Sequence, residues 1–148
     1  MAIARVALVD RIHLFVGSNR NPAMVLVQLL SDDKVWAHLL AANLRARGIR
    51  SRIGDVSGFE SRDERLSAES PLIIDFRIHT SAERSKCLEL VDAVRGDWDT
   101  IIAIVDTGWL RSMRDELPSI SVVQRHPDMR KLLPEILEII LDRQAVQI

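Results

Sequence analysis

The chain has 148 residues, of which 47% are hydrophobic and 28% are charged. This length and balance are typical of one globular domain with a full apolar core, and they leave too little chain for two ordinary domains. The formal net charge of -1 argues against a domain that attracts nucleic acid or an anionic membrane by its overall charge.

Residues 1–22 form an N-terminal extension that does not share the pattern of the rest of the chain. Residues 6–9 and 12–16 are rich in Val, Ile and Leu, which favours two short strands or one bent strand. Residues 17–22 are typical of a turn. We expect this extension to lengthen the edge of a sheet or to pair with a second copy of the chain.

Nothing in the sequence resembles a membrane or export segment. No apolar run reaches the roughly 18 to 20 residues that span a bilayer, and charged residues interrupt the N-terminal extension. We therefore expect a cytoplasmic protein. The single cysteine, Cys87, excludes an internal disulfide and a cysteine zinc site, and its place in a helical pattern predicts a small buried apolar residue.

From residue 23 to residue 148 the chain alternates strand and helix patterns, which predicts one domain. Runs of apolar residues bounded by turn residues indicate strands, and apolar residues repeating at about 3.6 positions indicate helices. Residues 55–70 are polar, with a weak helix pattern at 61–66, and Pro134 predicts that the last helix begins near it or bends there. The predicted strands are 24–30, 49–54, 71–76, 100–105 and 120–123, and the predicted helices are 33–47, 82–95, 109–116 and 129–141.

The first predicted helix has clear start and stop signals. Asp32 or Asp33 can cap its N-terminus, and Gly48 can end it. Its predicted inward-facing stripe consists of Val35, Trp36, Leu39, Leu40 and Leu44.

Three of the predicted strands end on acids. Asp75 ends an apolar strand, Asp106 ends another, and Asp32 and Asp33 follow the first. Alternating strands and helices with fully apolar strands predict a doubly wound parallel α/β sheet, in the flavodoxin-like order 2-1-3-4-5. The carboxyl ends of such strands meet at one edge, and a buried Asp there must be hydrated or paired.

The order of these motifs resembles a response-regulator receiver domain of the CheY type. The segment 29–33 looks like the family's acid-bearing first strand, and Asp75 lies at the phosphoacceptor position. Counted back from Gly48, the family's two acids fall on Ser31 and Asp32, and Asp33 replaces one of them if the register slips by one residue. The resemblance implies Mg²⁺ at Asp32, Asp33 and Asp75.

The sequence departs from the receiver pattern at two further positions. Asp106 falls where the family has a Ser or Thr, with Thr107 one residue later, and Gln124 falls where it has a lysine, with Arg125 adjacent. Loss of the lysine removes a cation that would stabilise a phosphoryl group. These departures favour a pseudoreceiver, although capping or turn duty is the simpler role for Asp106.

The resulting hypothesis is a regulatory domain and not an enzyme. It acts through a protein partner or by homodimerisation, with a histidine kinase among the partners that the resemblance implies, and without contacting nucleic acid or membrane. Residues 109–141 are the expected contact surface, and the domain is expected to be the N-terminal part of a larger regulator. One alternative is a receiver that is phosphorylated at Asp75 with Mg²⁺. A weaker alternative is a flavodoxin-like domain that binds a small molecule at the same edge.

Overall fold

The computed structural model of the chain describes residues 25–57, 59 and 70–147, which belong to the α/β domain. The N-terminal extension predicted at 1–22 and the weak helix predicted at 61–66 lie outside the described residues.

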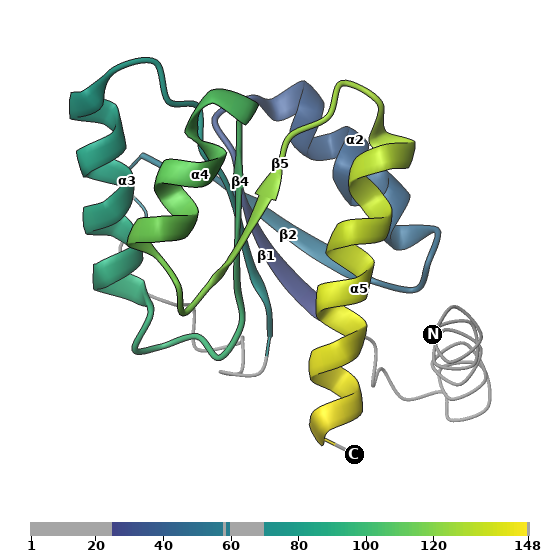
Figure 1. Ribbon diagram of the computed structural model, residues 1–148. Helices are drawn as coiled ribbons and strands as arrows, with labels where there is room; N and C mark the ends of the chain where they lie inside the picture. Colours follow the sequence, from purple (N-terminus) through teal and green to yellow (C-terminus); the bar gives the residue numbers. More distant parts are fainter. Residues whose placement is uncertain (1–24, 58, 60–69, 148) are drawn as a thin grey trace.

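Five parallel strands form one sheet in the order β2-β1-β3-β4-β5, which confirms the predicted flavodoxin-like arrangement (Figure 1). Because all of the paired strands run in parallel, the carboxyl ends of the five strands lie at the same edge. The strands are β1 (Leu26–Leu30), β2 (Arg50–Gly54), β3 (Leu72–Asp75), β4 (Ile101–Val105) and β5 (Ser121–Gln124).

Four helices cover the two faces of the sheet. Helices α2 (Lys34–Arg45) and α5 (Met129–Gln147) lie on one face, and α3 (Ser81–Val94) and α4 (Thr107–Glu116) lie on the other (Figure 1). All four predicted helices are therefore present. The last one begins before Pro134 and continues through it.

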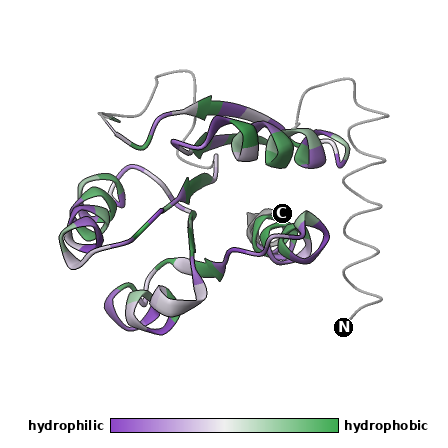
Figure 2. Cartoon of the chain, turned by 90° about the horizontal axis from the view of Figure 1, so that it is seen from above, coloured by the Kyte–Doolittle hydropathy of each residue, from purple (hydrophilic) through white to green (hydrophobic). Residues whose placement is uncertain are grey.

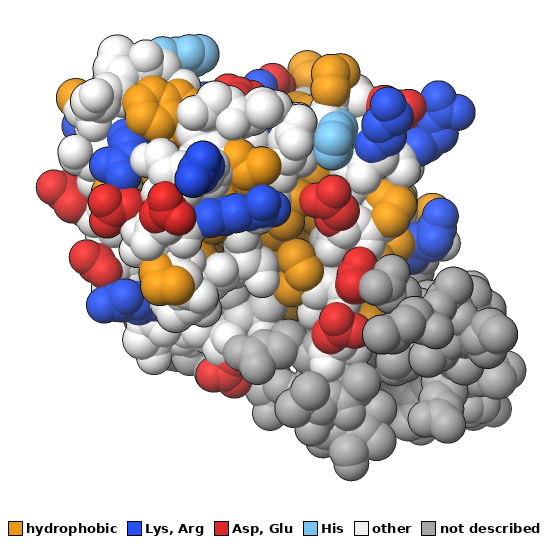
Figure 3. Space-filling view, in the orientation of Figure 1, with side chains coloured by type: hydrophobic (Ala, Val, Ile, Leu, Met, Phe, Trp, Pro, Cys, Tyr) orange, Lys and Arg blue, Asp and Glu red, His pale blue; other side chains and the backbone are white. Residues whose placement is uncertain are grey.

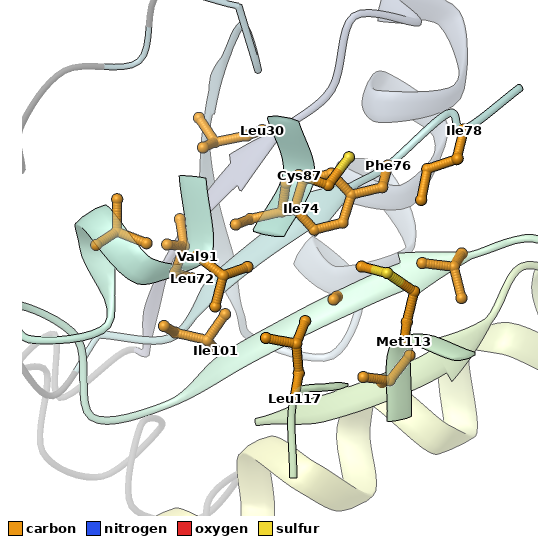
Figure 4. Close-up of a cluster of buried hydrophobic side chains, with 14 of the residues drawn as sticks. Leu30, Leu72, Ile74, Phe76, Ile78, Cys87, Val91, Ile101, Met113 and Leu117 are labelled. Carbon is orange, nitrogen blue, oxygen red and sulfur yellow. The ribbon is translucent and has the colours of Figure 1, made fainter. Parts of the chain in front are cut away.

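Each face of the sheet has its own apolar core, because successive strand residues point to opposite faces. Ile74 faces α3 and α4 together with Phe76, Val91 and Met113 (Figure 4). Ile73 faces α2 and α5. In Figure 2 hydrophobic segments lie along the strands between the two helical layers, with hydrophilic residues among them.

Helix α2 differs from its predicted packing. Leu40 and Leu44 are buried as predicted, but Val35 is 83% exposed and Leu39 is 51% exposed. The inward stripe includes Ala37 instead, because the small residue lets the helix lie close to the sheet. Gly48 adopts the left-handed conformation (φ 81°) that the tight turn into β2 requires.

Cys87 is buried between α3 and the sheet, as predicted. Burial raises the pKa of its thiol from 9.0 to about 12, and the nearby carboxylate of Glu83 contributes to the rise. Within the described residues, no helix has the length and apolarity that crossing a bilayer would require.

Candidate functional site

Asp75 lies at the centre of the carboxyl edge, at the end of β3. Its side chain has no solvent exposure. An ionised carboxylate in such a place must be neutralised and hydrogen-bonded, since its burial would otherwise cost several kcal/mol. Residues from the neighbouring strand ends supply that neutralisation.

Arg125 is the main partner of Asp75. Its Nε donates to Asp75 Oδ1 at 3.0 Å, and its Nη2 donates to the same oxygen. The side chain of Arg125 is only 9% exposed, and its Nη1 donates to Asp106 Oδ1. One guanidinium therefore joins the ends of β3, β4 and β5.

Two further residues complete the environment of Asp75. Ser31 Oγ, directly after β1, donates to Asp75 Oδ2 at 2.7 Å. Arg77 Nε donates to the same oxygen at 2.9 Å. Each carboxylate oxygen therefore accepts two hydrogen bonds, which is the usual capacity of its lone pairs.

Strand alternation explains why these particular side chains meet. Ser31, Asp75 and Asp106 stand two residues after Leu29, Ile73 and Ile104, respectively, which all face the core under α2 and α5. Arg125 stands two residues after Val123, which faces the same core. Because the side-chain period of a strand is two, all four polar residues continue onto that face.

The backbone holds Arg125 in this register. Its N–H donates to the carbonyl of Val105 at 2.8 Å, which extends the pairing of β4 with β5 by one residue. The guanidinium is thus positioned by the sheet and not by a loop.

Gln124 points to the other face of the sheet, as the alternation requires. Its Nε2 donates to Thr107 Oγ1 at 2.6 Å, at the first residue of α4. Gln124 and Thr107 therefore contact each other and link β5 to α4. The strand alternation separates Gln124 from the side of the sheet on which Arg125 meets Asp75.

Asp106 occupies the N-cap position of α4 but makes no side-chain cap hydrogen bond. This corrects the expectation that its carboxylate serves mainly as a cap or in a turn. The carboxylate is taken up by Arg125, because a charged partner at the strand ends attracts it more strongly than a backbone N–H does.

Asp32 and Asp33 lie at the same edge but have separate roles. Asp33 Oδ1 accepts from the N–H of Trp36 at 3.1 Å and so caps α2, as predicted. Asp32 Oδ1 accepts from the N–H of Val56 at 3.0 Å, in the segment that follows β2. Each carboxylate has its own local partner.

Arg77 connects the capping aspartate to the buried one. Its Nη2 lies 3.4 Å from Asp33 Oδ2, an ion pair whose geometry is not that of a hydrogen bond. Its guanidinium carbon also lies 5.5 Å from the ring centroid of Trp36, within cation–π range. Trp36 is partly buried against the core under α2 and α5, and one face of its indole contacts the guanidinium of Arg77.

A cavity of about 350 Å³ adjoins Asp75 on the side of α3. Asp32 and Asp75 both line it, which places the two carboxylate-bearing residues on one rim. Arg77, Glu83, Lys86 and Phe59 complete much of its wall. The cavity has charged side chains both at the carboxyl edge and on α3, with Phe59, Cys87 and Leu90 among its apolar lining.

The expected magnesium set is not gathered around one point. Within the described ranges, no three His, Cys, Asp or Glu side chains are grouped so that they could hold a metal ion. Asp75, which would be the central ligand, already accepts hydrogen bonds from Arg125, Arg77 and Ser31. A cation there would have to displace at least one of these donors, and the magnesium site remains a prediction.

The sequence reasoning located the acids but not all of their partners. It named Arg125 only as the neighbour of Gln124, noted Ser31 only as a substituted acid, and assigned no role to Arg77. Following the strand alternation past each strand end would have selected Ser31 and Arg125. Arg77 lies two residues after Asp75 and continues the same pattern.

Comparison of the chain with protein-family models, with curated proteins and with solved structures gave no match.

Proposed function

We propose that this chain is a receiver-like signalling domain that acts through protein–protein contacts and does not run the ordinary cycle of aspartyl phosphorylation. The flavodoxin-like strand order and the position of Asp75 support the receiver-like part of the proposal. The proposal places the domain in the cytoplasm, as an N-terminal regulatory part of a larger protein, without enzymatic activity.

The arginine pairing of Asp75 is the observation that carries the proposal. A phosphoacceptor needs a carboxylate oxygen that is free to attack phosphorus and a cation that is free to bind the phosphoryl oxygens. Here Oδ1 accepts from Arg125 and Oδ2 from Arg77 and Ser31. The two guanidinium groups supply the positive charge that Mg²⁺ and lysine supply in a receiver, and they hold it against the carboxylate.

The lysine position of the receiver pattern holds Gln124, as predicted, and the neighbouring Arg125 adds a cation that the sequence analysis did not assign to the site. Gln124 itself is uncharged, but Arg125 delivers a cation to the same edge of the sheet. The pocket is therefore not short of positive charge. Its charged side chains already form hydrogen bonds and ion pairs with one another. This favours one fixed conformation of the site over a change between two conformations.

The partner surface of this proposal is the side that carries α4, β5 and α5. Figure 3 shows apolar side chains between charged ones of both signs on this side of the molecule. Trp109 and Leu110 on α4 are only partly buried against the core. A protein partner, a histidine kinase or a second copy of the chain would contact this surface.

Treatment with Mg²⁺ and a small phosphodonor such as phosphoramidate tests the proposal. We expect no gain of a phosphoryl group in the intact mass of the wild-type chain and no Mg²⁺-dependent change in tryptophan emission. A mass gain that Asp75→Asn abolishes would instead establish the phosphorylatable receiver. The variant Arg125→Lys with Arg77→Ala is the informative comparison, because it frees oxygens of Asp75 and restores a lysine near the family position.

The cavity beside Asp75 favours a second candidate function, the binding of a small molecule. Its volume of about 350 Å³ lies within the range of ligand pockets. Arg77 and Lys86 can pair with an anionic group of a ligand, and the carboxylates of Asp32, Asp75 and Glu83 share the lining. A panel of nucleotides and other small anions would be screened by melting temperature, since a ligand that binds only the folded state raises it. A shift that Lys86→Ala removes would favour this function over the first.

A further inference from the structure

Among the described residues, β2 is the outermost strand of the sheet and forms one of its edges. The N–H of Arg50 donates to the carbonyl of Val25, and the carbonyl of Gly54 accepts from the N–H of Ser31. In a parallel pair, every second residue directs both backbone groups to its neighbour. Arg50, Arg52 and Gly54 therefore face β1, and the backbone groups of Ser51 and Ile53 point outward.

A groove of about 790 Å³ runs beside this edge, between β2 and α2. Ala41, Ala42 and Ile53 give it an apolar floor, and His38 and Arg45 flank it from the helix. Ser51 also lines the groove, and its hydroxyl oxygen is buried without a hydrogen-bond partner. A buried hydroxyl in this condition indicates a place where a further polar group can be accommodated.

Among the described residues that line the groove, the charged side chains are basic. Arg45, Arg47 and Arg50 are exposed, and none of the three pairs with a carboxylate of the described residues. The neighbouring Asp55 is engaged by Lys34. An exposed strand edge with unpaired cations beside it attracts an extended segment of negative charge.

We propose that β2 and the adjoining groove bind an extended acidic peptide segment of a partner protein, which adds a sixth strand to the sheet. Its backbone pairs with the outward groups of Ser51 and Ile53. Its acidic side chains lie on the face of Arg50, where directly opposite charges on paired strands stabilise each other. Its alternate, small apolar side chains face Ala41, Ala42 and Ile53.

Charge distinguishes this occupant from two others. If two copies of the chain paired through this edge, Arg50 of each copy would lie near Arg45, Arg47 and Arg50 of the other. These like charges would repel each other. Residues 1–24 of this chain carry three arginines (Arg5, Arg11 and Arg20) against one acid, Asp10, so they are basic as well. An acidic partner segment matches the groove better than either.

The proposal is independent of the proposed receiver-like function, because no step of it involves Asp75 or α4. The probe is a fluorescent, end-blocked peptide of sequence Asp-Val-Glu-Val-Glu-Val-Asp, titrated into the full chain and followed by anisotropy. We expect saturable binding that weakens at least about tenfold in Arg50→Glu. Arg111→Glu, an equal charge change on the exposed side of α4, is the matched control and should bind as the wild type does.

Backbone pairing is tested separately from charge. Ser51→Pro removes an outward N–H that the sheet does not use, and proline is tolerated at such edge positions. We expect it to retain the far-ultraviolet circular dichroism of the wild type and to lose peptide binding. A probe with the same charges but N-methyl groups on alternate peptide nitrogens should not bind the wild-type chain, and this test requires no folded variant.

Four outcomes would overturn the proposal. Equal binding of the N-methylated and unmodified probes would mean that charge alone attracts the peptide. If the acidic probe did not bind, an acidic partner segment would be excluded. The same conclusion would follow if a Lys-Val-Lys-Val-Lys-Val-Lys probe bound equally well. A dimer in sedimentation that Ser51→Pro dissociates would assign the edge to a second copy of the chain.

Discussion

Arg125 reaches from the end of β5 to the carboxylate of Asp75 at the end of β3, across the width of β4. Both side chains are almost fully buried, and the same guanidinium also binds Asp106 at the end of β4. The pair therefore joins three strands at the edge where an α/β sheet of this order carries its sites.

The first prediction concerns the stability of this pair. Arg125→Met should destabilise the fold by about 3 kcal/mol, because it leaves a buried carboxylate with one guanidinium instead of two. Asp75→Asn should cost a similar amount, since two arginines then lack their shared anion. The measurement is urea unfolding followed by circular dichroism.

A double variant measures the coupling free energy between Arg125 and Asp75 apart from their contacts with other residues. If the two side chains act as a unit, Arg125→Met with Asp75→Asn should cost about as much as either change alone. Additive losses would contradict a direct coupling between Arg125 and Asp75.

The second prediction concerns Arg77, which is 35% exposed and contacts Asp75, Asp33 and Trp36. Arg77→Ala should cost about 1 kcal/mol, because the buried Asp75 keeps Arg125 and Ser31. The emission of Trp36 should change as well, since the cation over its ring is lost. Arg77→Lys keeps a charge but not the planar fork, so it should recover only part of the stability.

The third prediction concerns pH. The pKa of the Cys87 thiol is raised from 9.0 to about 12 in the folded chain. The thiol therefore releases its proton more readily in the unfolded chain, and stability should fall as pH rises from 9 toward 12. Cys87→Ala should show a smaller fall over this range in unfolding experiments.

The same burial predicts low reactivity of the thiol. Native Cys87 should alkylate slowly with iodoacetamide at about pH 8 and rapidly after unfolding in urea. Fast alkylation of the native chain would contradict its burial.

The fourth prediction contrasts the two sides of α2. Leu40 is fully buried and Leu39 is 51% exposed. Leu40→Ala should cost about 3 kcal/mol, because it leaves a cavity in the core, whereas Leu39→Ala should change stability by less than about 0.5 kcal/mol. Equal effects in thermal or urea unfolding would mean that Leu39 is covered by a contact in solution.

The amino-acid sequence by itself determined the strand and helix order, the parallel sheet and the placing of acids at one edge. These features follow from local patterns: apolar runs in Ile73–Ile74 and Ile101–Val105, the 3.6-residue repeat of α5 and the capping role of Asp33. The exposure of Val35 and Leu39 did not follow, because an apolar helix residue is buried only where another element covers it.

Only the tertiary structure decided what the buried carboxylate contacts. Asp75 and Arg125 are 50 residues apart in the chain. Alternation along β5 decides that Arg125, and not Gln124, shares a face with Asp75, but only the parallel order of β3, β4 and β5 brings the two strand ends close together. The assembly of the sheet therefore determines that two arginines enclose the carboxylate of Asp75.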